Sequence, residues 1–238
     1  MLRRLLALAW TARALDHRTE WAPAARTNTP KNVTVFYNIF AGGHKRGAEK
    51  IVLEQLHQIT NSSLWTNINE IRYATVGNEA VDGFVQKLCR KRGLPCIRLG
   101  HADVGSELNT LQPLHDHCRE NNRDYVAYVH DKGSFHKTPA NVNLRRALLR
   151  ALSSQGCYDA VTSKTPLGEP CDVCSLRFSP LPHQHVSGNM WLARCSYVKR
   201  LIAPAKFPTA MAKFKRNAFG ACRLHRRPTY GRVTESTH

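Results

Sequence analysis

The sequence predicts an α/β fold with a mostly parallel sheet and helices on both of its faces. Runs rich in β-branched and aromatic residues alternate along the chain with amphipathic segments of helical periodicity, and this alternation is typical of βαβ units. One run, Tyr125–Val129, is apolar without polar alternation, as expected of a strand that is buried on both faces. We therefore expect one large α/β domain organised around this strand.

Local patterns justify the elements in chain order. Val33–Phe40 is β-branched and aromatic throughout, which predicts the first strand. The helix after it places four aliphatic residues between Ile51 and Ile59 on one face. Pro139 opens the helix that follows the central strand, and Gly156 is expected to stop it. The expected elements are strands at 33–40, 71–76, 95–99, 125–129 and 158–162, and helices at 48–59, 80–92, 106–121 and from 139 to Gly156.

A polar cluster directly follows the central strand. His130, Asp131 and Lys132 stand at its carboxyl end, where ligands collect in open α/β sheets. Gly133 lets the backbone turn and approach a ligand closely. The alternative is an ordinary solvated turn, whose composition is similar. The glycine-rich loop at 41–47 lacks the spacing of a dinucleotide fingerprint or a Walker loop, so it is a weak candidate for a phosphate cradle.

The net charge of +18 is unevenly distributed. Residues 31–125 carry twelve basic and ten acidic side chains, whereas residues 208–238 carry seven basic and one acidic side chain. This distribution fits an acidic or phosphorylated ligand as well as nucleic acid, and no motif of a known nucleic-acid module accompanies it. We therefore do not expect nucleic acid as a partner. The tail, 208–238, shows no periodicity and is expected to be disordered or loosely attached.

Residues 1–32 are expected to be a targeting segment or a linker. Two arginines precede only six apolar residues before Thr11, which is short for a secretory signal and far too short for a membrane span. A cleaved signal and an organelle transit peptide both remain open, and no transmembrane span is expected.

A proline-rich stretch carries a second set of candidate residues. Cys171-x-x-Cys174 is followed by His183-x-His185, and these residue types bind zinc tetrahedrally. The remaining spacing matches no standard zinc module. The alternatives are a disulfide, ordinary loop cysteines, or two histidines that face a substrate from the same side of an extended segment. The eight cysteines of the chain leave the redox compartment open.

Gly188, Asn189 and Trp191 suit the recognition of a sugar. The glycine admits a close backbone approach, the amide both donates and accepts hydrogen bonds, and the indole offers a plane on which an apolar sugar face can stack. The alternative is a buried core tryptophan at the start of a strand.

These motifs together resemble a family of glycosyltransferase-like proteins found in algae and in bacterial polysaccharide synthesis of the rhamnan-synthesis type. The family pattern is Tyr-x-His-x-Lys-Gly at the end of a central strand, an Asn and an Arg on the next helix, and a later Gly-Asn-x-Trp-x-Ala. The residues that match are Tyr128, His130, Lys132, Gly133, Asn141, Arg145, Ser187, Gly188, Asn189, Trp191 and Ala193. The algal branch also resembles Glu54-Gln55 and the segment from Cys171 to His185. Asp131 stands where the family usually has Thr or Asn.

The resemblance implies a GT-A-like domain at 33–207 that transfers a sugar from a nucleotide-sugar donor to a glycan or glycoprotein acceptor. His130 and Asp131 are the expected catalytic residues, and Asp131 is also the expected ligand of a Mn²⁺ or Mg²⁺ ion. Donor binding is expected at Asn38, Lys132, Gly133 and Arg145, and acceptor binding at His183, His185, Asn189 and Trp191. We favour the Golgi lumen over the plastid or the cytoplasm.

Two other functions compete with this one. The first is a basic binding module for RNA or an acidic polymer, stabilised by zinc at Cys171, Cys174, His183 and His185. The second is a catalytically dead, lectin-like relative that keeps the fold and binds a glycan.

Overall fold

The computed structural model describes residues 32–42, 45–134, 138–163, 170–179 and 185–213, and it confirms the predicted fold class. The strands are β1 (Val33–Ala41), β2 (Ile68–Gly77), β3 (Cys96–Ala102), β4 (Tyr125–His130), β5 (Val173–Cys174), β6 (Phe178–Ser179), β7 (His185–Val186) and β8 (Trp191–Arg194). Six of them form one sheet in the order β3-β2-β1-β4-β8-β5. Strands β3, β2, β1 and β4 run parallel, and β8 is antiparallel to both of its neighbours. Strands β6 and β7 pair separately.

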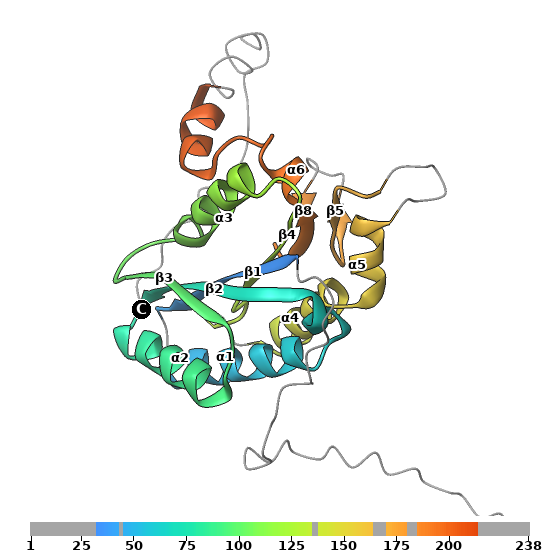
Figure 1. Cartoon of the computed structure of the whole chain (residues 1–238). Coiled ribbons are helices and arrows are strands. Elements are labelled where there is room, and N and C mark those ends of the chain that lie inside the picture. Colours follow the sequence, from blue (N-terminus) through green and yellow to red (C-terminus); the bar gives the residue numbers. More distant parts are fainter. Residues whose placement is uncertain (1–31, 43–44, 135–137, 164–169, 180–184, 214–238) are drawn as a thin grey trace, which may run out of the picture.

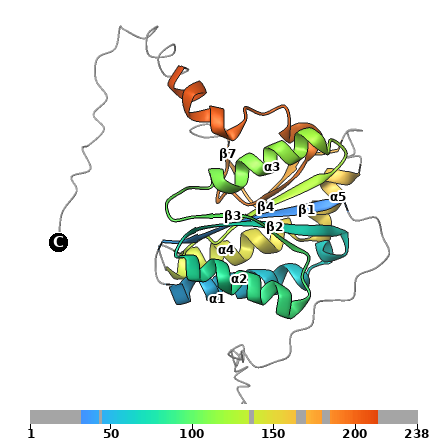
Figure 2. The same cartoon turned by 60° about the vertical axis from the view of Figure 1, so that its left-hand side comes forward.

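Helices cover both faces of this sheet. They are α1 (Lys45–Thr60), α2 (Glu79–Arg92), α3 (Leu108–Glu120), α4 (Pro139–Leu152), α5 (Gln155–Thr162) and α6 (Cys195–Val198), with 3-10 turns η1 (Ser63–Asn67) and η2 (Pro204–Lys206). Helices α1, α2 and α4 lie on one face, and α3 lies on the other (Figures 1 and 2).

The central strands β1 and β4 are buried along almost their whole length because both faces of the sheet are covered. In β1, the side chains of Val35, Tyr37 and Ile39 pack into the core beneath α1, α2 and α4, whereas Phe36 packs into the core beneath α3. Tyr128 of β4 also faces the α3 side. All five are at most 1% exposed. This burial on two sides explains why the predicted central strand lacks a polar face.

The predicted strand at 158–162 is wrong, because this segment is the second half of helix α5. The side chain of Ser154 caps the helix by accepting a hydrogen bond from the backbone N–H of Cys157. Cys157 and Val161 are the buried residues of the helix, and their spacing of four is helical. Gly156, expected to stop the preceding helix, lies in the first turn of α5.

Residues 207–213 form a short helix. Residues 214–238 lie outside the described residues, so the expectation that the tail is disordered or loosely attached stays a prediction. Among the described residues, no helix is both long enough and apolar enough to cross a membrane.

Three disulfides join elements of the described chain. They are Cys89–Cys96, Cys118–Cys195 and Cys157–Cys174. Cys118 lies on α3 and Cys195 begins α6 directly after β8, so the second disulfide attaches α3 to the end of the sheet. This attachment matters for the site below, because α3 begins at one wall of the pocket.

We predict that removing Cys118–Cys195 costs much more stability than removing Cys89–Cys96. The sequence separations are 77 and 7 residues, and the chain-entropy model then gives losses of roughly 4 and 2 kcal/mol. Urea unfolding of the paired alanine variants checks this. Equal losses, or the reverse order, would contradict the prediction.

Candidate functional site

The site lies where the chain order of the sheet reverses. From β1 the chain moves to β2 and β3 on one side, and β4 then pairs with the other side of β1. The loops that leave β1 and β4 therefore diverge, and a crevice opens between them at the carboxyl ends of the strands. A pocket of about 360 Å³, called here the switch-point pocket, occupies this position. Its lining residues are Asn38, Phe40, Gly105, Ser106, Glu107, His130, Asp131, Lys132, Gly133, Ser134 and Asn141.

Asp131 is a buried acid at the base of this pocket, with 2% of its surface exposed. Its Oδ1 accepts a hydrogen bond from the backbone N–H of Phe40 at 2.9 Å. Its Oδ2 has no hydrogen-bond partner within the described part of the chain. Burial raises the pKa of Asp131 to about 8, against the opposing effects of hydrogen bonds from the Phe40 backbone and from the side chain of Ser134. The carboxyl is therefore mostly protonated at neutral pH unless a cation binds beside it.

His130 is held in one tautomer. Its Nε2 lies 2.8 Å from the carbonyl oxygen of Gly188, and because a carbonyl can only accept, Nε2 carries the hydrogen. In the neutral ring, Nδ1 then has a free lone pair, and it lies 3.9 Å from Oε1 of Glu107. Burial lowers the pKa of His130, with a smaller contribution from Lys132, while the contacts to Gly188 and Glu107 act in the opposite direction. The ring is therefore neutral at physiological pH.

Lys132 and Gly133 form the turn that closes the pocket. Within the described chain, the Lys132 ammonium makes no hydrogen bond or ion pair, so it is available to an anion in the pocket. Gly133 has a φ of 86°, a left-handed conformation that glycine adopts without a steric penalty. The turn is closed by a hydrogen bond from the backbone N–H of Ser134 to the carbonyl oxygen of Asp131.

Arg145, predicted to bind the donor, lies behind the turn instead. It is 3% exposed and does not line the switch-point pocket. Its Nη1 donates to the carbonyl oxygen of Lys132 at 2.9 Å, and its Nη2 donates to Oε1 of Glu54 at 3.1 Å. This geometry gives Arg145 the role of supporting the Lys132 backbone rather than contacting a ligand in the pocket.

Asn38 is a polar residue of β1 that lines the pocket. Its Oδ1 accepts a hydrogen bond from the hydroxyl of Thr110 on α3 at 3.0 Å. Its amide nitrogen makes no hydrogen bond within the described chain, so its two N–H groups remain for a ligand. The backbone carbonyl of Asn38 accepts from the N–H of Asp131. Asn38 therefore joins α3, β1 and the polar cluster.

The sequence interpretation missed Glu107, which immediately precedes α3 and forms the wall opposite His130. Asn189 donates a hydrogen bond from its side-chain nitrogen to Oε2 of Glu107. The Oδ1 of Asn189 accepts from the indole N–H of Trp191 at 3.2 Å. One signal in the sequence could have found Glu107. It lies in the loop after the predicted strand at 95–99, and in a parallel sheet this loop leaves the same edge as the cluster at 130–133.

Trp191 packs against the core on the α3 side of the sheet, as expected of a core tryptophan, and its role in sugar recognition stays a prediction. Its ring is half-buried and packs against Tyr128 with centroids 5.7 Å apart. Neither Asn189 nor Trp191 lines the switch-point pocket, but Asn189 holds a residue that does. The two predicted acceptor-binding residues therefore lie immediately outside the pocket wall.

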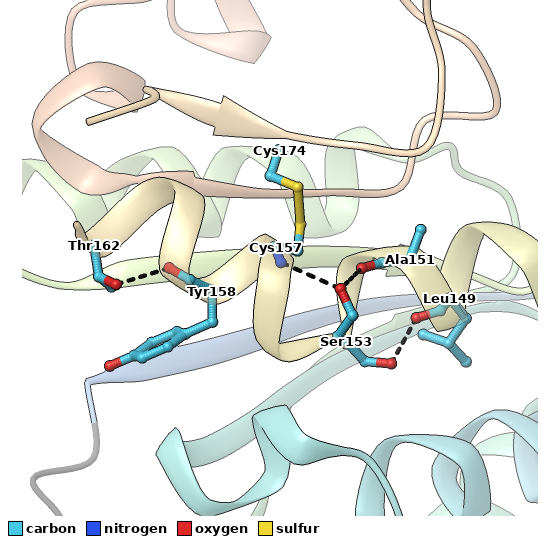
Figure 3. The surroundings of a disulfide bond; sticks show 8 residues. Leu149, Ala151, Ser153, Cys157, Tyr158, Thr162 and Cys174 are labelled. Atoms are coloured by element: carbon cyan, nitrogen blue, oxygen red, sulfur yellow. Dashed lines mark hydrogen bonds between the residues drawn. A yellow bond between two sulfur atoms is a disulfide. The ribbon is translucent and has the colours of Figure 1, made fainter. Parts of the chain in front are cut away.

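The predicted zinc site is corrected by the structure. Cys174 of β5 is bonded to Cys157 of α5 (Figure 3), and a disulfide sulfur is not the thiolate that zinc requires. Cys171 is free and exposed, with its backbone N–H donating to Ala160. His183 lies outside the described residues. His185 faces Ser187 and does not line the switch-point pocket. Among the residues described, no group of three His, Cys, Asp or Glu side chains could hold a metal ion.

Comparisons with known proteins define a family but no activity. Residues 36–235 match a family model described as a "Domain of unknown function (DUF8361)", and this match continues past residue 207, the predicted end of the domain. No curated protein matches the chain. Among solved structures, 4-diphosphocytidyl-2C-methyl-D-erythritol synthase from Anaerococcus prevotii DSM 20548 matches with 11% identity, 76% coverage of each chain and a TM-score of 0.39. A likeness this distant carries no argument about activity.

We predict that Asp131 makes the folded protein less stable as the pH rises from about 4 to about 8. The folded chain keeps a proton on Asp131 up to a pKa of about 8, whereas the unfolded chain releases it near pH 4. The folded state therefore binds more protons in this window, and the free energy of unfolding falls with rising pH. The isosteric Asp131→Asn variant should lack this contribution. Urea unfolding of both proteins in metal-free buffer gives the difference curve, and a difference independent of pH would refute the prediction.

We predict that Gly188→Ala destabilises the fold by roughly 2 to 4 kcal/mol. Gly188 has a φ of 89°, and a Cβ there would lie 2.5 Å from Cδ1 of Leu148, so the substitution combines left-handed strain with overpacking. Gly83→Ala is the matched control, because a Cβ on that residue of α2 meets nothing within 4 Å and should stabilise the helix by up to about 1 kcal/mol. Thermal melts distinguish the two; similar melting temperatures would contradict this packing.

Proposed function

The chain therefore belongs to the DUF8361 family, and we propose that it is a glycosyltransferase that binds a nucleotide-sugar donor in the switch-point pocket. The observation that carries the proposal is the pairing, at the carboxyl ends of β1 and β4, of an available Lys132 ammonium with a buried carboxyl that has an unpaired oxygen. Both groups suit a diphosphate, one as a direct cation and the other as a holder of a divalent cation.

The donor diphosphate is assigned to the Lys132 side of the pocket. The Lys132 ammonium would offset the charge that develops on the leaving diphosphate, and the free amide N–H groups of Asn38 would donate to it. Gly133 leaves the backbone open to a close approach. Arg145 contributes indirectly, because it fixes the carbonyl of Lys132.

A Mn²⁺ or Mg²⁺ ion fits the pocket only together with the donor. Asp131 offers one unpaired carboxylate oxygen, and the described residues supply no complete set of protein ligands. Mg²⁺ commonly takes one or two carboxylates, substrate phosphates and waters, so a single carboxylate suffices when the diphosphate is present. Such an ion would supply positive charge to the leaving group and would keep Asp131 ionised in spite of its burial.

The acceptor is assigned to the wall formed by His130 and Glu107. Nδ1 of His130 has a free lone pair in the neutral ring, whose Nε2 donates to Gly188, and it would take a proton from an attacking hydroxyl. In that step the hydroxyl oxygen bonds to the anomeric carbon and gives its proton to Nδ1. The bond between the anomeric carbon and the diphosphate oxygen breaks, and the nucleoside diphosphate leaves with the electron pair. The proposed acceptor is a glycan or a glycoprotein.

The disulfides support a lumenal location. Three pairs among the described residues are typical of proteins that fold in an oxidising compartment and are rare in the cytosol. We therefore place the proposed activity in the secretory pathway, with the Golgi lumen as the compartment that contains nucleotide-sugar donors and glycan acceptors.

The test is donor binding by the full chain, with a panel of UDP- and GDP-sugars titrated in the presence of Mn²⁺. We predict that Lys132→Ala weakens donor binding by about 1.5 to 3 kcal/mol, roughly ten- to a hundredfold, without lowering the melting temperature, because its side chain is only half-buried. Lys87→Ala, on the exposed surface of α2, controls for net charge. No donor binding or hydrolysis by the parent protein would reject the proposed function, and unchanged binding by Lys132→Ala would reject its assigned site. Glycan binding without donor turnover would identify a lectin.

A further inference from the structure

A segment of the chain that follows α6 lies along α3 and is attached to it by its backbone. We call residues 199–213 the α3-flanking segment. The backbone N–H of Ala205 donates to Oε1 of Gln112 at 2.9 Å, and the carbonyl oxygen of Leu201 lies 3.3 Å from Nε2 of His115. Gln112 and His115 are three residues apart, so they lie on the same face of α3. The helical end of the segment stands out from the domain beyond α3 (Figures 1 and 2).

Three large apolar side chains of this segment are held in solvent. Leu201, Ile202 and Phe207 are 46%, 55% and 51% exposed. They are three of the eight large hydrophobic residues that are exposed in the described chain, and they lie within seven consecutive positions. The hydrogen bonds to α3 fix the backbone that carries them, so their exposure is a property of the folded state. A cluster of exposed apolar side chains on a folded surface commonly marks an interaction site.

The same segment is basic. It has four exposed cationic side chains and no acidic one, and the cations are Lys199, Arg200, Lys206 and Lys213. Arg200 lies 3.5 Å from Asp172, whereas the three lysines form no ion pair within the described chain. The sequence stays basic to its end, because residues 208–238, Lys213 included, carry seven basic side chains and one acidic side chain. The partner that fits this surface therefore has both an apolar part and an anionic part.

A membrane surface that contains anionic lipids has both parts. Leucine, isoleucine and phenylalanine side chains enter the boundary between headgroups and acyl chains, and basic side chains are attracted to the anionic headgroups. An acidic polysaccharide or a nucleic acid would pair with the lysines but would leave the aliphatic side chains of Leu201 and Ile202 in water. A second copy of the chain, related by a twofold axis, would bring two basic segments together, and like charges across an interface are unfavourable.

We propose that the α3-flanking segment docks the protein onto an anionic membrane surface. Leu201, Ile202 and Phe207 enter the membrane interface, and Lys199 and Lys206 contact the headgroups, which long lysine side chains reach while their apolar neighbours are buried. None of these residues lines the switch-point pocket, so membrane docking and sugar transfer can be tested separately.

The test is sedimentation of the full chain with vesicles of phosphatidylcholine alone and of phosphatidylcholine mixed with phosphatidylglycerol. We expect binding to the mixed vesicles, weakened by added salt because salt screens the attraction, and much weaker binding to phosphatidylcholine alone. The double substitution Ile202→Ser and Phe207→Ser keeps the net charge but removes apolar area that the membrane would bury, so it should weaken binding roughly tenfold or more. The double substitution Lys199→Gln and Lys206→Gln should also weaken binding and reduce its salt dependence. Melting temperatures should match that of the parent protein, because all four side chains are exposed.

The matched control is Val104→Ser, because Val104 is 91% exposed but lies between β3 and α3, outside the segment. This variant should bind the mixed vesicles as the parent does. No binding to the mixed vesicles, undiminished binding by the double serine variant, or an equal loss in Val104→Ser would overturn the proposal.

Two other partners would show themselves in the same samples, and each would also overturn the proposal. Self-association in place of vesicle binding, abolished in the double serine variant, would assign the apolar side chains to a second copy of the chain. Binding to heparin in place of vesicle binding, retained by the double serine variant, would assign the lysines to an acidic polymer. Vesicle binding by a protein that binds no nucleotide-sugar would support docking and reject only the proposed function.

Discussion

The hydrogen bond from the Phe40 backbone to the Asp131 side chain holds the site together. Strands β1 and β4 pair in parallel up to Asn38 and His130, and the N–H of Asp131 continues the ladder by donating to the carbonyl of Asn38. Beyond that point the strands diverge. The next backbone donor of β1 on this side is the N–H of Phe40, and it donates to the Asp131 carboxyl. The side chain thus replaces the backbone carbonyl that a continued β4 strand would supply. The pocket can open there because this side chain satisfies a backbone group that the divergence would leave unpaired.

Two side chains of the helices α1 and α4 hydrogen-bond to the backbone of the turn after β4, on the side away from the pocket. Gln55 of α1 donates to the carbonyl of His130 at 3.1 Å, and Arg145 of α4 donates to the carbonyl of Lys132 at 2.9 Å. Gln55 is itself fixed by the Tyr37 hydroxyl, which donates to it at 2.6 Å. These bonds satisfy the buried carbonyls of the turn and leave its side chains on the pocket side. Residues of α1 and α4 that never contact the pocket therefore determine its shape.

Local patterns predicted the central strand and the cluster at its end, because burial on both faces and the switch to polar residues are visible within a few positions. The wall contributed by Glu107 was not predictable in this way. Its contact with Asn189 spans 82 residues, and neither residue has a local pattern that implies the other. Helix α5 was mistaken for a strand because its apolar run is too short to separate the two periodicities. The Cys157–Cys174 disulfide could not be predicted either, because it depends on helix α5 lying beside strand β5.

The burial of Asp131 also costs the folded protein stability. An uncompensated carboxyl buried beside a strand end disfavours its charged form, as the pKa of about 8 records, and its second oxygen gains no hydrogen bond in return. An apolar residue at this position would avoid that cost, although it would leave the Phe40 N–H unpaired; a serine or asparagine could cap the N–H without burying a charge. The Phe40 bond alone therefore does not account for an acid here. In the proposed function the remaining oxygen supplies the reason for an acid, because it would hold a divalent cation that bridges to an anion, and the folded chain by itself leaves this oxygen without a hydrogen bond.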